Sequence, residues 1–219
     1  MTRGAHPPGV PGDGESGQNT QPMIDGQYEI AVQAARWVVE DGLEYGAAKR
    51  RAAKQLGLSG RGSLPSNEVM EEAVRDYIAV FCADTQPLEL LALRRLALVW
   101  MERLSEFRPH LGGAVWHGTA TANSDIYLQL FCDDSKSAEI ALIDQNVRYV
   151  PHTVTGFTGE SVDALSVHTF CAELNQDIGV HLMIYDFDDV RGALKMDAQG
   201  RSPRGDTRAL RRLLSLESS

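Results

Sequence analysis

The sequence predicts an α+β protein whose helical N-terminal half packs on a C-terminal half built around a mixed β-sheet. Apolar residues recur at helical spacing from Tyr28 to about Phe107. After Pro109 they alternate with polar residues, with a period of two. The change of period near Arg108 divides the chain into a helical region, 28–108, and an α+β region, 109–219.

The first residues have the composition of a flexible tail. Residues 2–21 are rich in Gly, Pro, Ser, Asn and Gln and contain almost nothing to bury. We therefore expect residues 1–27 to be disordered, and Met23 is an alternative start of the chain.

Four helices are expected in the helical region. The first covers residues 28–41, the second 44–56, the third follows an N-cap at Ser66, and the fourth runs from Thr85 to about Phe107. The fourth helix has the clearest apolar stripe, which consists of Leu90, Leu93, Ala97, Trp100 and Leu104.

Basic residues on these helices are expected to face water. On the fourth helix they are Arg94, Arg95 and Arg103. On the second helix they are Lys49, Arg50, Arg51 and Lys54, for which phosphate binding is the alternative interpretation.

Strands are expected in the second half wherever the period is two. The segments 125–130 and 180–185 alternate most clearly, and 148–154 and 166–170 do so more weakly. Short helices are expected over 135–145 and 189–194. A final helix is predicted after an N-cap at Asp206, and it buries Leu210, Leu213 and Leu214.

Composition excludes several classes of function. The net charge of −9 disfavours general binding to nucleic acid backbones. The sequence contains no apolar run of the roughly 20 residues needed to cross a bilayer and no secretory signal, so we expect a cytoplasmic protein without membrane contact. The three cysteines lack metal-ligand spacing and are expected to be free thiols: Cys82, Cys132 and Cys171.

One segment carries the functional argument. Gly112 and Gly113 are followed, after about a dozen residues, by Ser124 and Asp125 at the start of an alternating strand. This order resembles the signature of nucleotidyltransferases of the polymerase-β type, and the resemblance covers about residues 111–186. It implies that the C-terminal sheet is of the nucleotidyltransferase type.

The resemblance also implies a chemistry. In that family the glycine pair lets the backbone approach a triphosphate. Two aspartates of an Asp-x-Asp strand and a third carboxylate hold two divalent ions, Mg²⁺ or Mn²⁺, that align a hydroxyl with the α-phosphate. Asp125 matches the first aspartate and is the candidate catalytic and metal-binding residue. Gly112, Gly113 and Ser124 are the candidate nucleotide-binding residues.

The sequence departs from the family pattern at the other metal ligands. Tyr127 stands where the second aspartate is expected, and a neutral phenol is a poor ligand for magnesium. The position of the third carboxylate aligns with His181, a candidate ligand that prefers softer metals. The acidic run of Asp186, Asp188 and Asp189 is either a further metal site or a helix cap.

Further side chains near the signature are candidates for the substrate cleft. Trp116 and His117 lie in the loop between the glycine pair and Asp125, where they are placed to meet a base or sugar. Packing is the alternative interpretation for Trp116. Tyr127 and Gln129 share the polar face of the expected strand and are the other two candidates for the substrate cleft.

Three functions follow from these residues. The first is a degenerate nucleotidyltransferase-like protein that binds a nucleotide or small phosphate ligand without efficient transfer. The second is an active metal-dependent enzyme that transfers a nucleotidyl group to a small molecule or protein, using Asp125 and a carboxylate elsewhere in the chain. The third is a non-catalytic module that binds a partner protein through its helical half. Phosphate-loop and dinucleotide motifs are absent from the sequence, which excludes the enzymes that depend on them.

Overall fold

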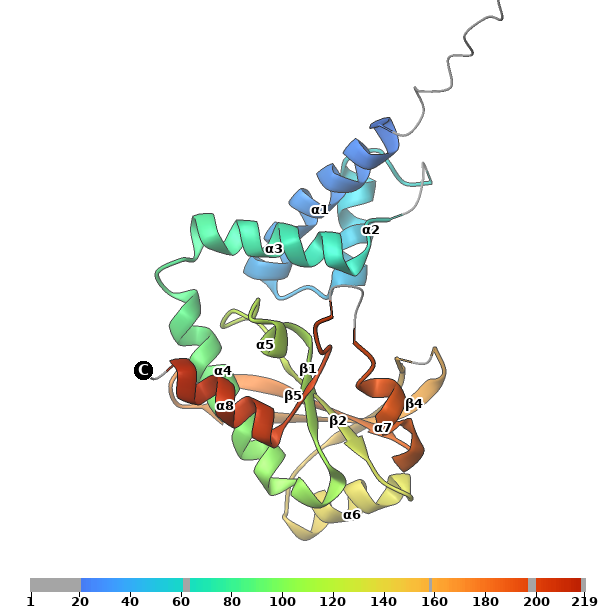
Figure 1. Ribbon diagram of the computed structural model, residues 1–219, viewed down its shortest axis with the longest axis vertical. Helices are drawn as coiled ribbons and strands as arrows, with labels where there is room; N and C mark the ends of the chain where they lie inside the picture. Colours follow the sequence, from blue (N-terminus) through green and yellow to red (C-terminus); the bar gives the residue numbers. More distant parts are fainter. Residues whose placement is uncertain (1–20, 61–63, 158, 197–199, 218–219) are drawn as a thin grey trace, which may run out of the picture.

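The computed structural model describes residues 21–60, 64–157, 159–196 and 200–217, with side chains from Gly26 onward. It has an α+β architecture in which N-terminal helices pack with a six-stranded mixed sheet, as the change of period predicts (Figure 1). No described helix combines the length and the apolar character that a membrane span requires.

Three helices form the first group: α1 (Gln21–Asp41), α2 (Tyr45–Gln55) and α3 (Asn67–Phe81). They share a hydrophobic core of their own, in which small side chains such as Ala34 and Ala48 let the helices approach closely. The predicted N-cap is confirmed, because the Ser66 hydroxyl accepts a hydrogen bond from the Val69 amide at 3.3 Å. Helix α1 begins seven residues before the expected Tyr28, so it overlaps the predicted tail; residues 1–20 lie outside the described residues.

The fourth helix, α4 (Gln86–Arg103), belongs to the other core. Its predicted apolar stripe packs against the sheet rather than against α1–α3. The boundary between these two cores therefore lies between α3 and α4. The change of period marks where strands begin, whereas the cores are divided by what each helix packs against.

Six strands form the sheet: β1 (His110–Gly112), β2 (Ile126–Phe131), β3 (Val150–Thr155), β4 (Ser161–Cys171), β5 (Gln176–Tyr185) and β6 (Gly205–Asp206). Their order is β3-β4-β5-β2-β1-β6, in which β2 and β5 are parallel and every other pair is antiparallel. All four predicted strands are found. The short β1 and β6 were not predicted, because three residues or fewer carry no readable alternation.

Two of the longer helices pack on the same face of this sheet. Helix α8 (Thr207–Glu217) lies beside α4, and Figure 1 shows the two together on one side of the strands. The cap predicted at Asp206 is confirmed, since its carboxylate accepts a hydrogen bond from the Ala209 amide at 2.7 Å. The other elements are α5 (Gly113–His117), α6 (Ser135–Asp144), α7 (Val190–Ala193) and the 3-10 turns η1 (Ser105–Phe107) and η2 (Phe187–Asp189).

The alternation of β2 places two kinds of residue on opposite faces. Ile126 and Leu128 are fully buried in the core beneath α4. Tyr127 lies on the opposite face, where it pairs with His181 of β5, which in turn pairs with Ser166 of β4. A row of polar and aromatic side chains therefore crosses the sheet on the face turned away from α4.

Two basic residues that were predicted to face water are buried. Lys49 is 8% exposed and donates a hydrogen bond to Asn67 Oδ1 at 2.7 Å, between α2 and α3, and burial lowers the pKa of its ammonium group. Arg94 is 6% exposed and bonds to the main chain of α5. Helical spacing places both residues off the apolar stripe, and these neighbours from other elements cover them.

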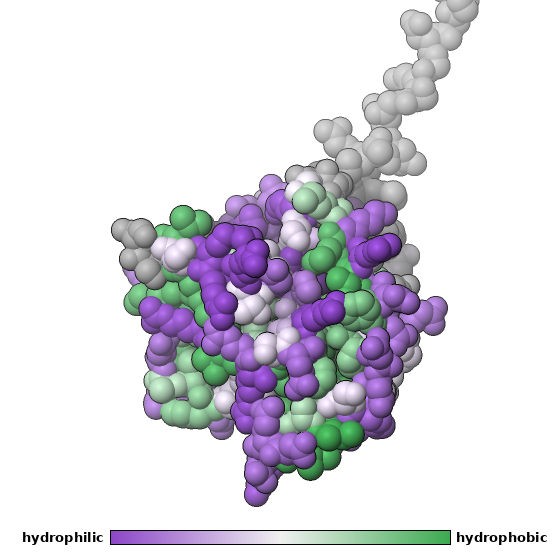
Figure 2. Space-filling model, turned by 60° about the horizontal axis from the view of Figure 1, so that its bottom comes forward, coloured by the Kyte–Doolittle hydropathy of each residue, from purple (hydrophilic) through white to green (hydrophobic). Residues whose placement is uncertain are grey.

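The molecular surface in Figure 2 is largely hydrophilic, and its hydrophobic side chains form separate small groups. Ile140 and Ile143 of α6 are both exposed and lie three positions apart, so they are neighbours on one face of that helix. Small exposed apolar groups of this kind are common on protein surfaces.

A candidate ligand-binding cavity between the helices and the sheet

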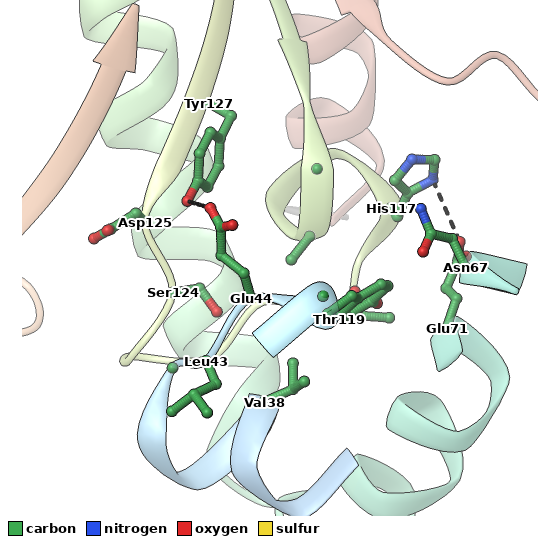
Figure 3. Close-up of a pocket in the computed structure, with 15 residues that line it drawn as sticks. Val38, Leu43, Glu44, Asn67, Glu71, His117, Thr119, Ser124, Asp125 and Tyr127 are labelled. Carbon is green, nitrogen blue, oxygen red and sulfur yellow. Dashed lines mark hydrogen bonds and ion pairs between the residues drawn. The ribbon is translucent and has the colours of Figure 1, made fainter. Parts of the chain in front are cut away.

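A cavity of about 550 Å³ lies where the α1–α2 junction, the first turn of α3, α5 and the beginning of β2 meet (Figure 3). Both halves of the chain contribute to its walls. The lining residues are Val38, Gly42, Leu43, Glu44, Tyr45, Gly46, Asn67, Glu71, Gly113, Ala114, His117, Thr119, Ser124, Asp125 and Tyr127.

Asp125 is held at the edge of this cavity by β5. Its Oδ1 accepts a hydrogen bond from the Gly179 amide and its Oδ2 lies 3.0 Å from His181 Nε2. A Cβ atom at position 179 would lie 2.6 Å from Asp125 Oδ1, so only glycine lets the carboxylate approach the strand this closely. In Figure 3 the Asp125 side chain points away from the Tyr127–Glu44 pair.

His181 is engaged at both ring nitrogens. Its Nδ1 lies 2.8 Å from the Ser166 hydroxyl, and its Nε2 faces Asp125. The imidazole also stacks on the Tyr127 ring, with 4.9 Å between centroids. Ser166 of β4, His181 of β5 and Asp125, which directly precedes β2, thus form a chain of hydrogen bonds. A metal ion at His181 would have to displace one of these hydrogen bonds.

The contact with His181 controls the ionisation of Asp125. The hydrogen bond from His181 is the main reason why the pKa of this carboxyl is lowered. Burial opposes this effect, and the His181 charge and the Gly179 amide each add a smaller lowering contribution. Because the folded-state pKa lies below the unfolded-state value, ionised Asp125 stabilises the fold at neutral pH. That contribution is lost as the pH falls from the unfolded-state value through the folded-state pKa.

The substitution His181→Gln should therefore raise the pKa of Asp125 toward the ordinary aspartate value. The physical reason is the loss of the largest interaction that favours the ionised form. Titration of the carboxyl carbon by NMR measures this directly. Ser166→Ala is the matched control, since it removes the other partner of the same ring and should move the Asp125 pKa far less. Equal pKa values in wild type and His181→Gln would contradict the assignment.

Tyr127 links the sheet to the helical half. Its phenol donates a hydrogen bond to Glu44 Oε1 at 2.8 Å, and Glu44 comes from the junction between α1 and α2 (Figure 3). Burial, followed by the nearby Glu44 charge, raises the pKa of Tyr127 above its ordinary value. The phenol therefore stays neutral at physiological pH and acts as a donor to Glu44.

The two glycines of the signature have different positions. Gly112 ends β1, and Gly113 begins α5 with a φ of +65°, a conformation that favours glycine. Only Gly113 lines the cavity. A Cβ there would lie 3.6 Å from Tyr127 Cδ2, so the glycine leaves this part of the ring uncovered.

The opposite wall of the cavity consists of Glu71, His117 and Thr119. Glu71 Oε2 lies 4.0 Å from His117 Nδ1, and its Oε1 receives ion-pair contacts from Arg75 and Arg201. Thr119 is 3% exposed, and its hydroxyl makes no hydrogen bond with a described group; the nearby Tyr45 phenol is not in normal hydrogen-bond geometry with it.

The structure brings together only part of the predicted site. Gly113, His117, Ser124, Asp125 and Tyr127 line one cavity. The remaining candidates do not line it. Trp116 packs against Gly205, and its Nε1 donates to the Ser202 carbonyl at 2.8 Å, as expected if its role is packing. Gln129 is 5% exposed and lies beneath Gly112.

The residues present do not fit a complete two-ion site. Within the part of the chain that the structure describes, no group of three or more His, Cys, Asp or Glu side chains is arranged to hold a metal ion. Of the three aligned positions only Asp125 is a carboxylate, and it is bound by His181 and Gly179. The Asp186 side chain makes no capping hydrogen bond at η2, so neither expectation for the acidic run is supported there.

The contributions of the helical half were missed from the sequence. Glu44, Tyr45 and Glu71 reach the cavity from segments that local patterns assign to ordinary amphipathic helices. A helix-flanking glutamate has no signature that distinguishes a cavity residue from a surface residue.

Comparison with protein-family models, with curated proteins and with solved structures gave no match. The likeness to nucleotidyltransferases therefore remains a resemblance in the residues around Gly112, Gly113 and Asp125.

Proposed function

We propose that this protein is nucleotidyltransferase-like and binds a nucleotide or similar phosphate ligand in the cavity without efficient nucleotidyl transfer. One observation carries the proposal: Gly113 and Asp125, separated by twelve positions in the sequence, line the same cavity. That is the juxtaposition the resemblance requires of its glycine pair and first carboxylate. Inefficient transfer follows from Tyr127, which occupies the second carboxylate position and is committed to Glu44.

The charge of the lining determines the form of the ligand. Glu44, Glu71 and Asp125 line the cavity, and no described lining residue is a lysine or arginine. These carboxylates would repel a free triphosphate. A nucleotide complexed with Mg²⁺ or Mn²⁺ carries less negative charge, and a single carboxylate plus the phosphates is a common way to bind magnesium. We therefore expect binding only in the presence of the divalent ion.

Calorimetric titration with ATP, GTP, CTP and UTP, each with and without Mg²⁺ or Mn²⁺, tests the proposal. Binding should require the metal and should be lost in Asp125→Ala. Asp177→Ala is the matched control, because it removes an exposed carboxylate from β5 outside the cavity lining and should bind like wild type. Absence of binding by the wild type under every condition would refute the proposal.

An active enzyme is the second candidate, and one observation favours it. Glu44 brings a carboxylate from the helical half to the position of Tyr127, where the family pattern has its second aspartate. Pyrophosphate release together with a nucleotidylated acceptor, both requiring Glu44 and Asp125, would establish transfer. The interaction-module alternative is less well supported, because the polar face of β2 borders a cavity rather than a flat surface.

A further inference from the structure

The carboxylates of the cavity differ in how they are compensated. Asp125 faces His181, and Glu71 receives the guanidinium groups of Arg75 and Arg201. The Glu44 carboxylate accepts a hydrogen bond from the neutral Tyr127 phenol, and no lysine or arginine is among the described residues of the lining. Glu44 is exposed, so its carboxylate is in contact with water and open to a cationic ligand in the cavity.

Aromatic surface lies beside this charge. The Tyr127 ring lines the cavity, and the missing side chain of Gly113 leaves an edge of that ring uncovered. The phenol remains neutral and directs its hydrogen toward Glu44. A carboxylate next to a tyrosine ring is a combination that attracts ammonium groups, through ionic attraction and through the ring quadrupole.

A second, independent feature points to a ligand. Thr119 is buried at the cavity wall, and its Oγ1 has no hydrogen-bond partner among the described residues. Buried hydroxyls are almost always hydrogen-bonded, so this group is expected to find its partner in whatever occupies the cavity. Val38 and Leu43 add an apolar part of the lining that suits methylene groups.

We propose that the cavity binds a small amine, with its ammonium group at Glu44 and Tyr127, its methylene groups on Val38 and Leu43, and a polar group within reach of Thr119. This part of the inference rests on the proposed function: there the amine is a second ligand beside the nucleotide. Amine binding itself depends on Glu44 and Thr119 and does not require nucleotide.

Calorimetric titration with spermidine, without nucleotide or metal, tests this proposal. Wild-type protein should bind one spermidine, and Glu44→Gln should weaken binding about tenfold or more, since one charge-assisted contact is lost. Thr119→Val should also weaken binding, to a smaller extent. The uncharged 1,8-octanediol is the comparison compound and should not bind measurably.

Two control variants separate the site from general attraction to an acidic protein. Glu29→Gln removes the same charge from an exposed position on α1 and should bind like wild type. Thr119→Val leaves the Tyr127–Glu44 hydrogen bond in place, so its weaker binding tests the site even if Glu44→Gln folds poorly. The proposal fails if wild type does not bind spermidine, or if Glu44→Gln and Glu29→Gln weaken binding equally. Because the metal-dependent nucleotide titration is separate, failure of either proposal is recognised independently.

Discussion

Arg94→Met is expected to lower the free energy of unfolding by about 2–4 kcal/mol. The guanidinium of Arg94 donates to the carbonyls of Val115 at 3.0 Å and Trp116 at 3.2 Å, and it forms an ion pair with Glu217. Methionine fills similar space but removes these donors. Each buried carbonyl left without a partner costs about 1–3 kcal/mol, whereas the partly exposed Glu217 regains water.

Urea denaturation followed by circular dichroism measures this loss. The neighbouring residue supplies the control: Arg95 is half exposed and forms a surface ion pair with Glu173 at 3.2 Å. Arg95→Met should therefore change the free energy of unfolding by less than about 1 kcal/mol. Similar losses of unfolding free energy in the two variants would mean that the buried hydrogen bonds from Arg94 to α5 do not stabilise the fold as the geometry indicates.

Gly42→Ala should be destabilising by about 2–4 kcal/mol. Gly42 has a φ of +66°, which costs an alanine about 1–2 kcal/mol. A Cβ there would also lie 2.4 Å from the Asn123 carbonyl oxygen, a backbone atom that cannot rotate away, and relief of such a contact costs about 1–3 kcal/mol more. Asn123 is itself fixed, since its side-chain amide donates to the carbonyls of Val39 and Glu40.

Gly57→Ala isolates the clash from the backbone strain. Gly57 has nearly the same φ, +69°, but a Cβ at that position meets nothing within 4 Å. Both variants gain the same stabilisation through a less flexible unfolded chain. Thermal and urea unfolding should therefore show a clearly larger loss for Gly42→Ala. If the two losses were equal, the contact between the α1–α2 junction and residues 121–124 would not be tightly packed.

Gly42→Ala should also change the cavity, because residues adjacent to Gly42 and to Asn123 in the sequence line it. Leu43 and Glu44 follow directly and line the cavity, and Ser124 follows Asn123 on the other side of the contact. A shift of the main chain here would separate Glu44 from Tyr127. Helices α1–α3 and the sheet have separate cores, so a few close contacts rather than a shared core hold these helices on the sheet.

Much of the fold follows from local patterns. The alternation in β2 and β5 predicts the strands, and the caps at Ser66 and Asp206 are formed by short-range hydrogen bonds that depend only on neighbouring residues. The position of Asp125 at the start of a strand was predictable for the same reason.

The site was predictable only in part. Gly113 and Asp125 belong to one contiguous signature, and their shared cavity agrees with it. Trp116 and Gln129 are in the same segment, yet the first packs against Gly205 and the second is buried. Spacing along the chain does not say which side of a loop faces a cavity, because that depends on the elements packed around it.

The sequence by itself determined the α+β class, the order of the longer helices and strands and the polar face of β2, since these depend on periodicity and on neighbours within a few residues. Only the tertiary structure decided that α4 joins the core of the sheet, that Arg94 and Lys49 are buried, and that Glu44 meets Tyr127 across 83 positions of sequence. The physical reason is that burial and charge pairing are set by contacts between distant segments, which a local pattern does not contain.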